Sequence, residues 1–185
     1  MKKTIYNILR FTLLTFISLS MTIILYAQVG IKVSTPYGEM EFCDDDNSTN
    51  ALERFSKASG DYRTDSLNTL AIINVCKASD GALSEIMDYI CLEDFINKPN
   101  VVIDIYLQNE NVLEEYISFL AIGVYNKDHF DYSDTSLSYA DKLENEIQKK
   151  IIDNEDRVIL SQIMSLIKLK YKKYLKMINQ SSGIE

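Results

Sequence analysis

Residues 65–78 read DSLNTLAIINVCKA, and this stretch decides the fold class of the chain. Its apolar side chains fall on more than one side of a helix, which is typical of a central helix packed among others. These side chains belong to Leu67, Leu70, Ala71, Ile72, Ile73 and Val75. The pair Asp80-Gly81 stops the segment. We therefore predict an all-α domain with residues 65–78 as a central helix.

Helical periodicity continues on both sides of this stretch. Five further segments place apolar residues three and four positions apart, as one face of a helix requires. They are residues 50–59, 82–96, 111–126, 135–153 and 155–179. Residues 101–107, VVIDIYL, are rich in strand-forming types, but the neighbouring segments are helical and no partner strand is near, so we interpret them as a helix. We expect six or seven helices, arranged either as a compact bundle or as a short HEAT-like stack of helical hairpins.

The residues before the helices have a different pattern. Residues 29–33 and 40–42 alternate apolar with other side chains, and Pro36 and Gly38 between them favour a turn. This pattern predicts a short β-hairpin or an extended arm. The expected organisation is a signal segment at 1–27, an arm and polar hinge at 28–47, a single helical domain at 48–180 and a flexible tail at 181–185.

The first 27 residues predict export. Three cations in residues 1–10 precede a stretch without charge, residues 11–31, and residues 25–27 read LYA, which is the order of a secretory signal cut after Ala27. The string QVGI at 28–31 followed by TPYG at 35–38 resembles the mature start of some exported bacterial surface and tail-fibre-like proteins. This resemblance supports cleavage but implies no activity. An uncleaved membrane anchor is the alternative, and in both cases the body lies in the periplasm or at the cell surface.

The charge of the chain bears on the class of its partner. Sixteen of the 19 basic residues and all 27 acidic residues follow residue 27, so this part has a net charge of −11. Such a body argues against nucleic acid, which needs a positive surface, and suits a basic protein partner. Acidic charge also keeps exported domains soluble without any ligand. The basic run at 157–184 lies at the end of a helix, where cations complement the helix dipole.

Cys43, Cys76 and Cys91 are the three cysteines. In an oxidising compartment, an odd number predicts either one disulfide with a spare thiol or no disulfide. If residues 65–78 and 82–96 form a hairpin about Asp80, Cys91 faces residue 69 and lies roughly 10 Å along the axes from Cys76, beyond disulfide reach. We therefore expect any bridge to use Cys43, and we interpret Cys76 and Cys91 as small buried apolar residues.

The residues required for several kinds of catalytic and binding site are absent from this sequence. One histidine excludes sites with several histidine ligands for zinc. The six glycines form no phosphate-binding loop, and no serine lies in a nucleophile-elbow pattern. We predict no catalytic residue, no cofactor and no metal ion.

The densest group of polar and aromatic side chains lies in an expected loop at 126–134. Its candidate partner-binding residues are Asp128, His129, Phe130, Asp131, Tyr132 and Asp134. Carboxylate pairs can serve glycoside hydrolysis or bind a divalent cation, but three acids in one loop are not unusual in so acidic a chain. Acidic and aromatic side chains together form the amphipathic patches that anchor protein interfaces. We interpret the loop as such a patch.

Three functions follow as hypotheses. The first is an exported, non-enzymatic binding protein that engages a basic partner, as an inhibitor or an immunity protein does; small helical periplasmic immunity proteins are similar in size and class. The second is a helical scaffold or adaptor in a cell-envelope assembly. The third is a hydrolase that uses acidic residues, which requires a pocket with two carboxylates.

Overall fold

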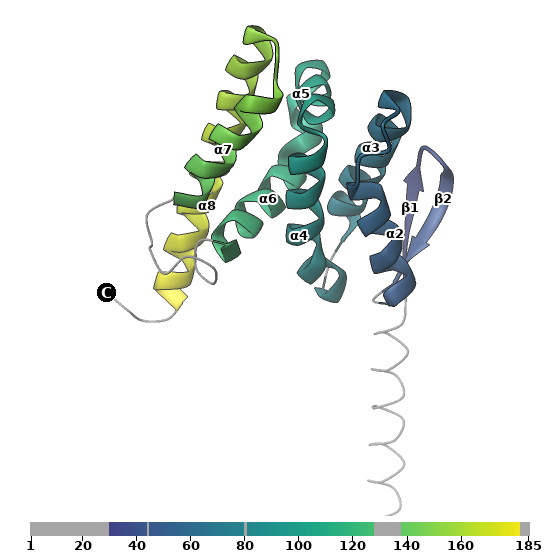
Figure 1. Ribbon diagram of the computed structural model, residues 1–185. Coiled ribbons are helices and arrows are strands. Elements are labelled where there is room, and N and C mark those ends of the chain that lie inside the picture. The colour runs from purple at the N-terminus through teal and green to yellow at the C-terminus, as the bar shows by residue number, and fades with distance from the viewer. Residues whose placement is uncertain (1–29, 44, 80, 128–137, 182–185) are drawn as a thin grey trace, which may run out of the picture.

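The computed structural model describes residues 30–43, 45–79, 81–127 and 138–181 of the 185-residue chain. In these ranges the chain forms seven α-helices behind a two-stranded antiparallel hairpin (Figure 1), which confirms the predicted all-α fold class and the N-terminal hairpin. The predicted signal segment, residues 1–27, lies outside the described residues, as do residues 182–185 of the predicted tail. None of the described helices is both long enough and apolar enough to cross a membrane.

The elements follow one another along the chain with short connections. The strands are β1 (Ile31–Thr35) and β2 (Gly38–Phe42), and a 3-10 turn, η1 (Glu110–Leu113), joins two of the helices. The helices are α2 (Asp46–Ser56), α3 (Tyr62–Ala78), α4 (Gly81–Asn97), α5 (Pro99–Gln108), α6 (Glu114–Asn126), α7 (Ser138–Lys150) and α8 (Asn154–Ser181).

The hairpin lies against the central helix. Ile31 pairs with Phe42 and Thr35 with Gly38, whose φ of 106° is the left-handed conformation that glycine adopts without strain. The strands turn Val33 and Phe42 inward, where both are buried. The side chain of Asn74 donates to the carbonyl of Ser34 at 2.8 Å. The hairpin therefore covers one side of α3 instead of forming a free arm.

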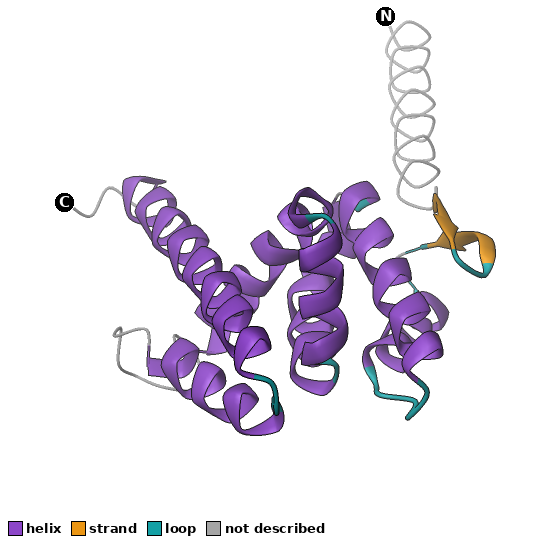
Figure 2. Ribbon diagram, turned by 90° about the horizontal axis from the view of Figure 1, so that it is seen from above, coloured by secondary structure: helices purple, strands orange, loops and turns teal. Residues whose placement is uncertain are grey.

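The helices lie side by side in chain order, from α2 and α3 beside the hairpin to α7 and α8 at the other end (Figures 1 and 2). Helix α6 packs against α4 on one side and α8 on the other. Its close approach to α4 needs Gly123, because a Cβ there would lie 2.7 Å from the carbonyl oxygen of Asp88. One continuous apolar core runs from Val33 to Tyr171.

The structure defines the conformation of residues 101–107 and the start of helix α2. Residues 101–107 are helical, as expected, and Pro99 occupies the first turn of α5, where its missing N–H costs nothing. Helix α2 begins earlier than the predicted segment 50–59, at Asp46. The carboxylate of Asp45 accepts a hydrogen bond from the backbone N–H of Ser48 at 2.7 Å, which satisfies the first turn. Part of the expected polar hinge is therefore a helix start.

Candidate functional site

The six residues predicted to bind a partner lie outside the described residues. Asp128, His129, Phe130, Asp131, Tyr132 and Asp134 all belong to the segment 128–137, between the end of α6 and the start of α7. The last residue of α6, Asn126, donates from its amide to the carboxylate of Asp88 at 2.5 Å, which ties the end of α6 to α4. The assignment of the loop to partner binding stays a prediction.

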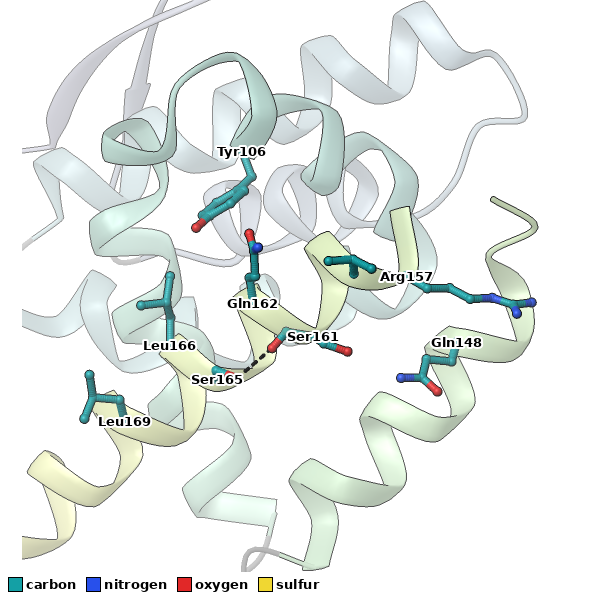
Figure 3. A pocket seen from close by; sticks show the side chains of 9 residues that line it. Tyr106, Gln148, Arg157, Ser161, Gln162, Ser165, Leu166 and Leu169 are labelled. Carbon is teal, nitrogen blue, oxygen red and sulfur yellow. Dashed lines mark hydrogen bonds between the residues drawn. The ribbon is translucent and has the colours of Figure 1, made fainter. Parts of the chain in front are cut away.

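A groove of about 730 Å³ lies between α5 and α8, with α7 beside it (Figure 3). Its apolar lining consists of Tyr106 from α5 and of Val158, Leu166 and Leu169 from α8. Val158 is 59% exposed and Leu169 52% exposed. Apolar side chains gathered on an outer face mark surfaces where another molecule binds. We call this surface the α5–α8 groove.

Helix α8 carries two apolar faces, and this explains why the groove exists. One face is buried against the core, and its residues are Leu160, Ile163, Met164, Ile167 and Tyr171. Val158, Gln162, Leu166 and Leu169 recur every three or four positions along the other face, so they line up along the helix. Helices α5, α6 and α7 all pack against α8, and its second face borders the groove.

Polar groups are interspersed with this apolar lining. Gln148 from α7 and Gln162 from α8 bring side-chain amides to the groove, and amides can both donate and accept hydrogen bonds. Ser165 Oγ donates to the carbonyl of Ser161 at 2.7 Å. The guanidinium of Arg157 makes intramolecular hydrogen bonds, because Nε and Nη2 donate to the carbonyl of Ile151 at 3.0 and 2.9 Å. No carboxylate among the described residues lines this part of the groove.

The groove continues past Tyr106 and Leu166 into a smaller hollow of about 300 Å³. This end is bordered by Glu110, Glu114 and Lys170. The ammonium of Lys170 lies 3.6 Å from a carboxylate oxygen of Glu114, and Glu114 remains mostly exposed. The groove is therefore apolar along α8 and carries acidic side chains where it meets η1 and α6.

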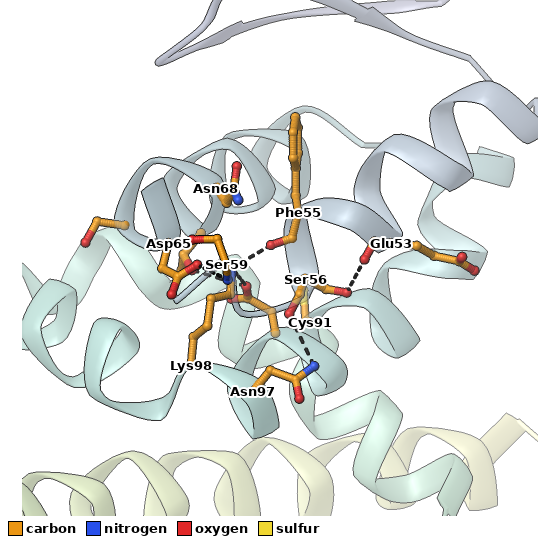
Figure 4. Close-up of polar contacts among 12 residues, drawn as sticks. Glu53, Phe55, Ser56, Ser59, Asp65, Asn68, Cys91, Asn97 and Lys98 are labelled. Carbon is orange, nitrogen blue, oxygen red and sulfur yellow. Dashed lines mark hydrogen bonds and ion pairs between the residues drawn. The ribbon is translucent and has the colours of Figure 1, made fainter. Parts of the chain in front are cut away.

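A second cluster of polar side chains lies inside the core, where α2 to α6 meet. Asp94 and Lys98 form an ion pair whose side chains are 0% and 1% exposed. The Lys98 ammonium also donates to the carbonyl of Phe55 at 2.6 Å, and the amide of Asn97 donates to the carbonyl of Ser56 at 3.3 Å (Figure 4). These contacts hold the C-terminal end of α2 against the junction of α4 and α5.

The Asp94 carboxylate accepts two further hydrogen bonds. Thr69 Oγ1 donates to one oxygen at 3.1 Å and Tyr116 Oη to the other at 2.8 Å. Burial raises the pKa of Asp94, although the Lys98 charge and these hydrogen bonds act in the opposite direction. Burial, followed by the Asp94 charge, also raises the pKa of Tyr116 well above its ordinary value. Because Asp94 is fully buried, we assign this cluster to holding the helices together.

The two buried cysteines correct one prediction. The sulfurs of Cys76 and Cys91 are 3.3 Å apart, so the expectation that helix geometry separates them by roughly 10 Å is wrong. Thr69 faces Asp94 instead of Cys91, which means that α4 is displaced by several residues along α3 relative to a simple hairpin about Asp80. Both cysteines are buried, as predicted, and all three cysteines have free thiols.

The α5–α8 groove was not predicted, although the sequence of α8 contains a second apolar stripe that indicates it. The helix predicted at 155–179 rests on one apolar stripe, formed by Ile159, Ile163, Ile167, Tyr171, Tyr174 and Ile178. Of these residues, Ile163, Ile167 and Tyr171 are buried. Helix α8 has further apolar residues outside that stripe, Val158, Leu166 and Leu169. An amphipathic helix needs only one apolar stripe to pack on a core, so a second stripe indicates a second surface.

Within the described ranges, no group of three or more His, Cys, Asp or Glu side chains is placed to hold a metal ion.

No protein-family model matches the chain, and no curated protein or solved structure matches it either.

Proposed function

We propose that the protein is an exported, non-enzymatic binding protein that engages a basic protein partner, as an inhibitor or an immunity protein does. Export follows from the signal predicted in residues 1–27. The observation that carries the proposal is the row of exposed apolar side chains on α8, which faces Tyr106 across the α5–α8 groove. A groove of this kind receives an apolar segment of another protein.

The charge of the chain supports a basic partner. The net charge is −8 for the whole chain, and the acidic residues all follow the predicted signal. Opposite charge speeds the diffusional encounter of two proteins and selects against acidic competitors. Glu110 and Glu114 put part of this charge at one end of the groove.

The shape and lining of the groove favour an amphipathic helix as the bound segment. Val158, Leu166 and Leu169 offer an apolar strip to side chains that recur every three or four residues. Lysine or arginine side chains of the partner would then lie near Glu110 and Glu114. The predicted patch in the segment 128–137 would add acidic and aromatic contacts to the same partner.

A helical scaffold or adaptor in a cell-envelope assembly is the second candidate, because the same apolar face of α8 also suits a permanent assembly contact. The two functions differ in what recruits the partner. A scaffold depends on apolar contacts and keeps its partner at high salt, whereas an inhibitor of a basic protein loses association rate as salt screens the charges.

Affinity capture tests the proposal and separates the two candidates. Tagged full-length protein is expressed in its native cells, isolated from the envelope, and washed at low and high salt. One basic protein recovered at equimolar ratio and lost at high salt supports the binding-protein function. Several envelope proteins that stay bound at high salt support the scaffold. Recovery of no protein above the level of an untagged control contradicts both.

A further inference from the structure

The thiols of Cys76 and Cys91 lie in contact in the core, on two different helices. Cys76 belongs to α3 and Cys91 to α4, and the two sulfurs are 3.3 Å apart. Cys76 is 3% exposed and Cys91 is fully buried. We propose that this pair is a disulfide site, in which an oxidant joins Cys76 to Cys91 and leaves Cys43 as the free thiol.

The geometry requires little movement. A disulfide bond is about 2.05 Å long, so the sulfurs have to approach by about 1.3 Å, which side-chain rotation and small backbone shifts can supply. The two helices are held near this position by other contacts. Thr69 donates to Asp94 at 3.1 Å, and Tyr116 donates to the carbonyl of Cys91 at 3.2 Å. The native packing of α3, α4 and α6 therefore places the two sulfurs where a bond can join them with little movement of either helix.

The chemistry balances with a disulfide-bearing oxidant, such as oxidised glutathione or an oxidised dithiol protein. One cysteine thiolate attacks the oxidant, forming a mixed disulfide and releasing one thiol of the oxidant. The second cysteine thiolate then attacks the sulfur of the first, forming the Cys76–Cys91 bond and releasing the other thiol. Two electrons pass to the oxidant, and the two cysteine protons end on the released thiols. The oxidising compartment that supplies such an oxidant rests on the proposed export.

The burial of the pair determines when the bond forms. Burial raises the pKa of Cys91 well above its ordinary value, and the neighbouring Cys76 and the charges of Asp94 and Asp88 act in the same direction. In the folded protein the Cys91 thiol therefore carries little thiolate, and because both cysteines are buried an oxidant cannot reach them. The bond therefore forms during folding, as α4 packs onto α3 and while an oxidant still has access to the sulfurs, and it then resists reducing agents in the native protein.

Cys43 has a different environment. It follows β2 at the edge of the hairpin and is partly exposed, and its backbone N–H donates to the hydroxyl of Ser48 at 2.9 Å. Cys43 thus serves as an internal reference, because an alkylating reagent should modify it whatever the state of the buried pair.

The experiment refolds the full-length protein in a buffer with reduced and oxidised glutathione. Fully reduced, unfolded chain is allowed to fold, denatured again without reductant, alkylated and mapped by mass spectrometry. We expect alkylation at Cys43 alone and a peptide that joins Cys76 to Cys91. Alkylation of all three cysteines, or a linked peptide that contains Cys43, overturns the proposal.

Thermal unfolding gives a second readout that does not depend on mapping. A loop-closing disulfide should raise the melting temperature by roughly 5–10 °C over the reduced protein. The shift should persist in Cys43→Ala and disappear in Cys76→Ala, and a shift of the same size in Cys76→Ala contradicts the pairing. In both experiments the glutathione buffer supplies the oxidant, so the result does not depend on export. If neither the linked peptide nor the rise in melting temperature is seen, the Cys76–Cys91 pairing is wrong. If the bond forms on refolding but Cys76 and Cys91 are reduced in protein isolated from cells, the pairing holds and the proposed export to an oxidising compartment is contradicted.

Discussion

Asp94 and Lys98 form an ion pair that is almost completely shielded from solvent, although the two residues are only four positions apart at the junction of α4 and α5. Both side chains of the pair also form hydrogen bonds to other helices. Through the carboxylate the pair contacts α3 and α6, and through the ammonium it contacts the end of α2. Helices α2 to α6 therefore meet at one charged centre.

Removal of the cation should destabilise the protein strongly. Lys98→Met leaves the Asp94 carboxylate and the Phe55 carbonyl without their partner in the core, and breaking a buried ion pair costs about 3–5 kcal/mol. The free energy of unfolding, measured by urea titration, should fall by this amount at neutral pH. Lys77→Met, at an exposed position of α3, is the matched control and should change it by less than about 0.5 kcal/mol. Equal effects of the two substitutions would show that the buried pair has no special role.

The same centre predicts a pH dependence with a definite sign. The pKa of Asp94 is raised in the folded protein, so the folded state binds a proton more tightly than the unfolded chain. The contribution of Asp94 to stability is therefore complete at low pH and is lost as the pH rises from about 4 through the raised pKa. In Asp94→Asn this loss is absent, because the amide does not titrate.

Urea titrations of wild type and Asp94→Asn at a series of pH values test this sign. The difference in free energy of unfolding should shift in favour of the Asn variant by up to about 1.4 kcal/mol per pH unit within the window. Other carboxylates titrate equally in both proteins and cancel. A shift in favour of wild type as the pH rises would mean that the folded-state pKa of Asp94 is lowered instead.

Gly123 should not tolerate alanine, although alanine is the better helix former. A Cβ at this position of α6 would meet the backbone carbonyl of Asp88 in α4, and such overpacking costs about 1–3 kcal/mol. Without the contact, Gly123→Ala would stabilise the helix by about 1 kcal/mol, so the sign of the change is the test. Ser118→Ala, on the same helix, serves as the control and should have a small effect. An increase in melting temperature for Gly123→Ala would disprove the close approach of α4 and α6.

The fold class could be predicted because helical periodicity is a local property. Residues 101–107 show this well, since their β-branched side chains favour a strand and yet they form a helix among helical neighbours. Packing between helices is not local. The contact of Cys76 with Cys91 depends on how far α4 slides along α3, and many side chains together set that distance.

The buried ion pair and the groove escaped prediction for related reasons. Asp94 and Lys98 at a spacing of four positions are typical of an exposed pair on a helix surface, and only the crowding of five elements around them buries both. The α5–α8 groove depends on which face of α8 the other helices cover. The sequence indicates that Leu166 and Leu169 are apolar, but it does not show that they stay 36% and 52% exposed in the folded protein.

Charge reversal in the predicted loop should slow the association with a basic partner. Lysine in place of Asp128, Asp131 and Asp134 turns a patch of attraction into one of repulsion, and the association rate at low salt should fall by about tenfold or more. Surface plasmon resonance at several salt concentrations measures this rate. The dissociation rate should change less, because charge steers the encounter more than it holds the complex.

The control for this change reverses the same number of charges elsewhere. Its exposed positions, on the hairpin and at the start of α4, are Glu39, Glu41 and Glu85. Since both variants gain the same net charge, a slower association in the loop variant alone assigns the effect to the loop. Equal association rates in the two variants would remove the loop from the binding surface.

A pair of substitutions on α8 distinguishes the α5–α8 groove from the rest of the helix surface. Leu169→Glu places a charge in the groove, whereas Met177→Glu places the same charge on the same helix outside it. The two side chains are similarly exposed, at 52% and 59%, so neither change should alter the melting temperature. Titration calorimetry with the captured partner should show an affinity at least about tenfold weaker for Leu169→Glu and an unchanged affinity for Met177→Glu. Wild-type affinity in Leu169→Glu would contradict the groove as the binding surface.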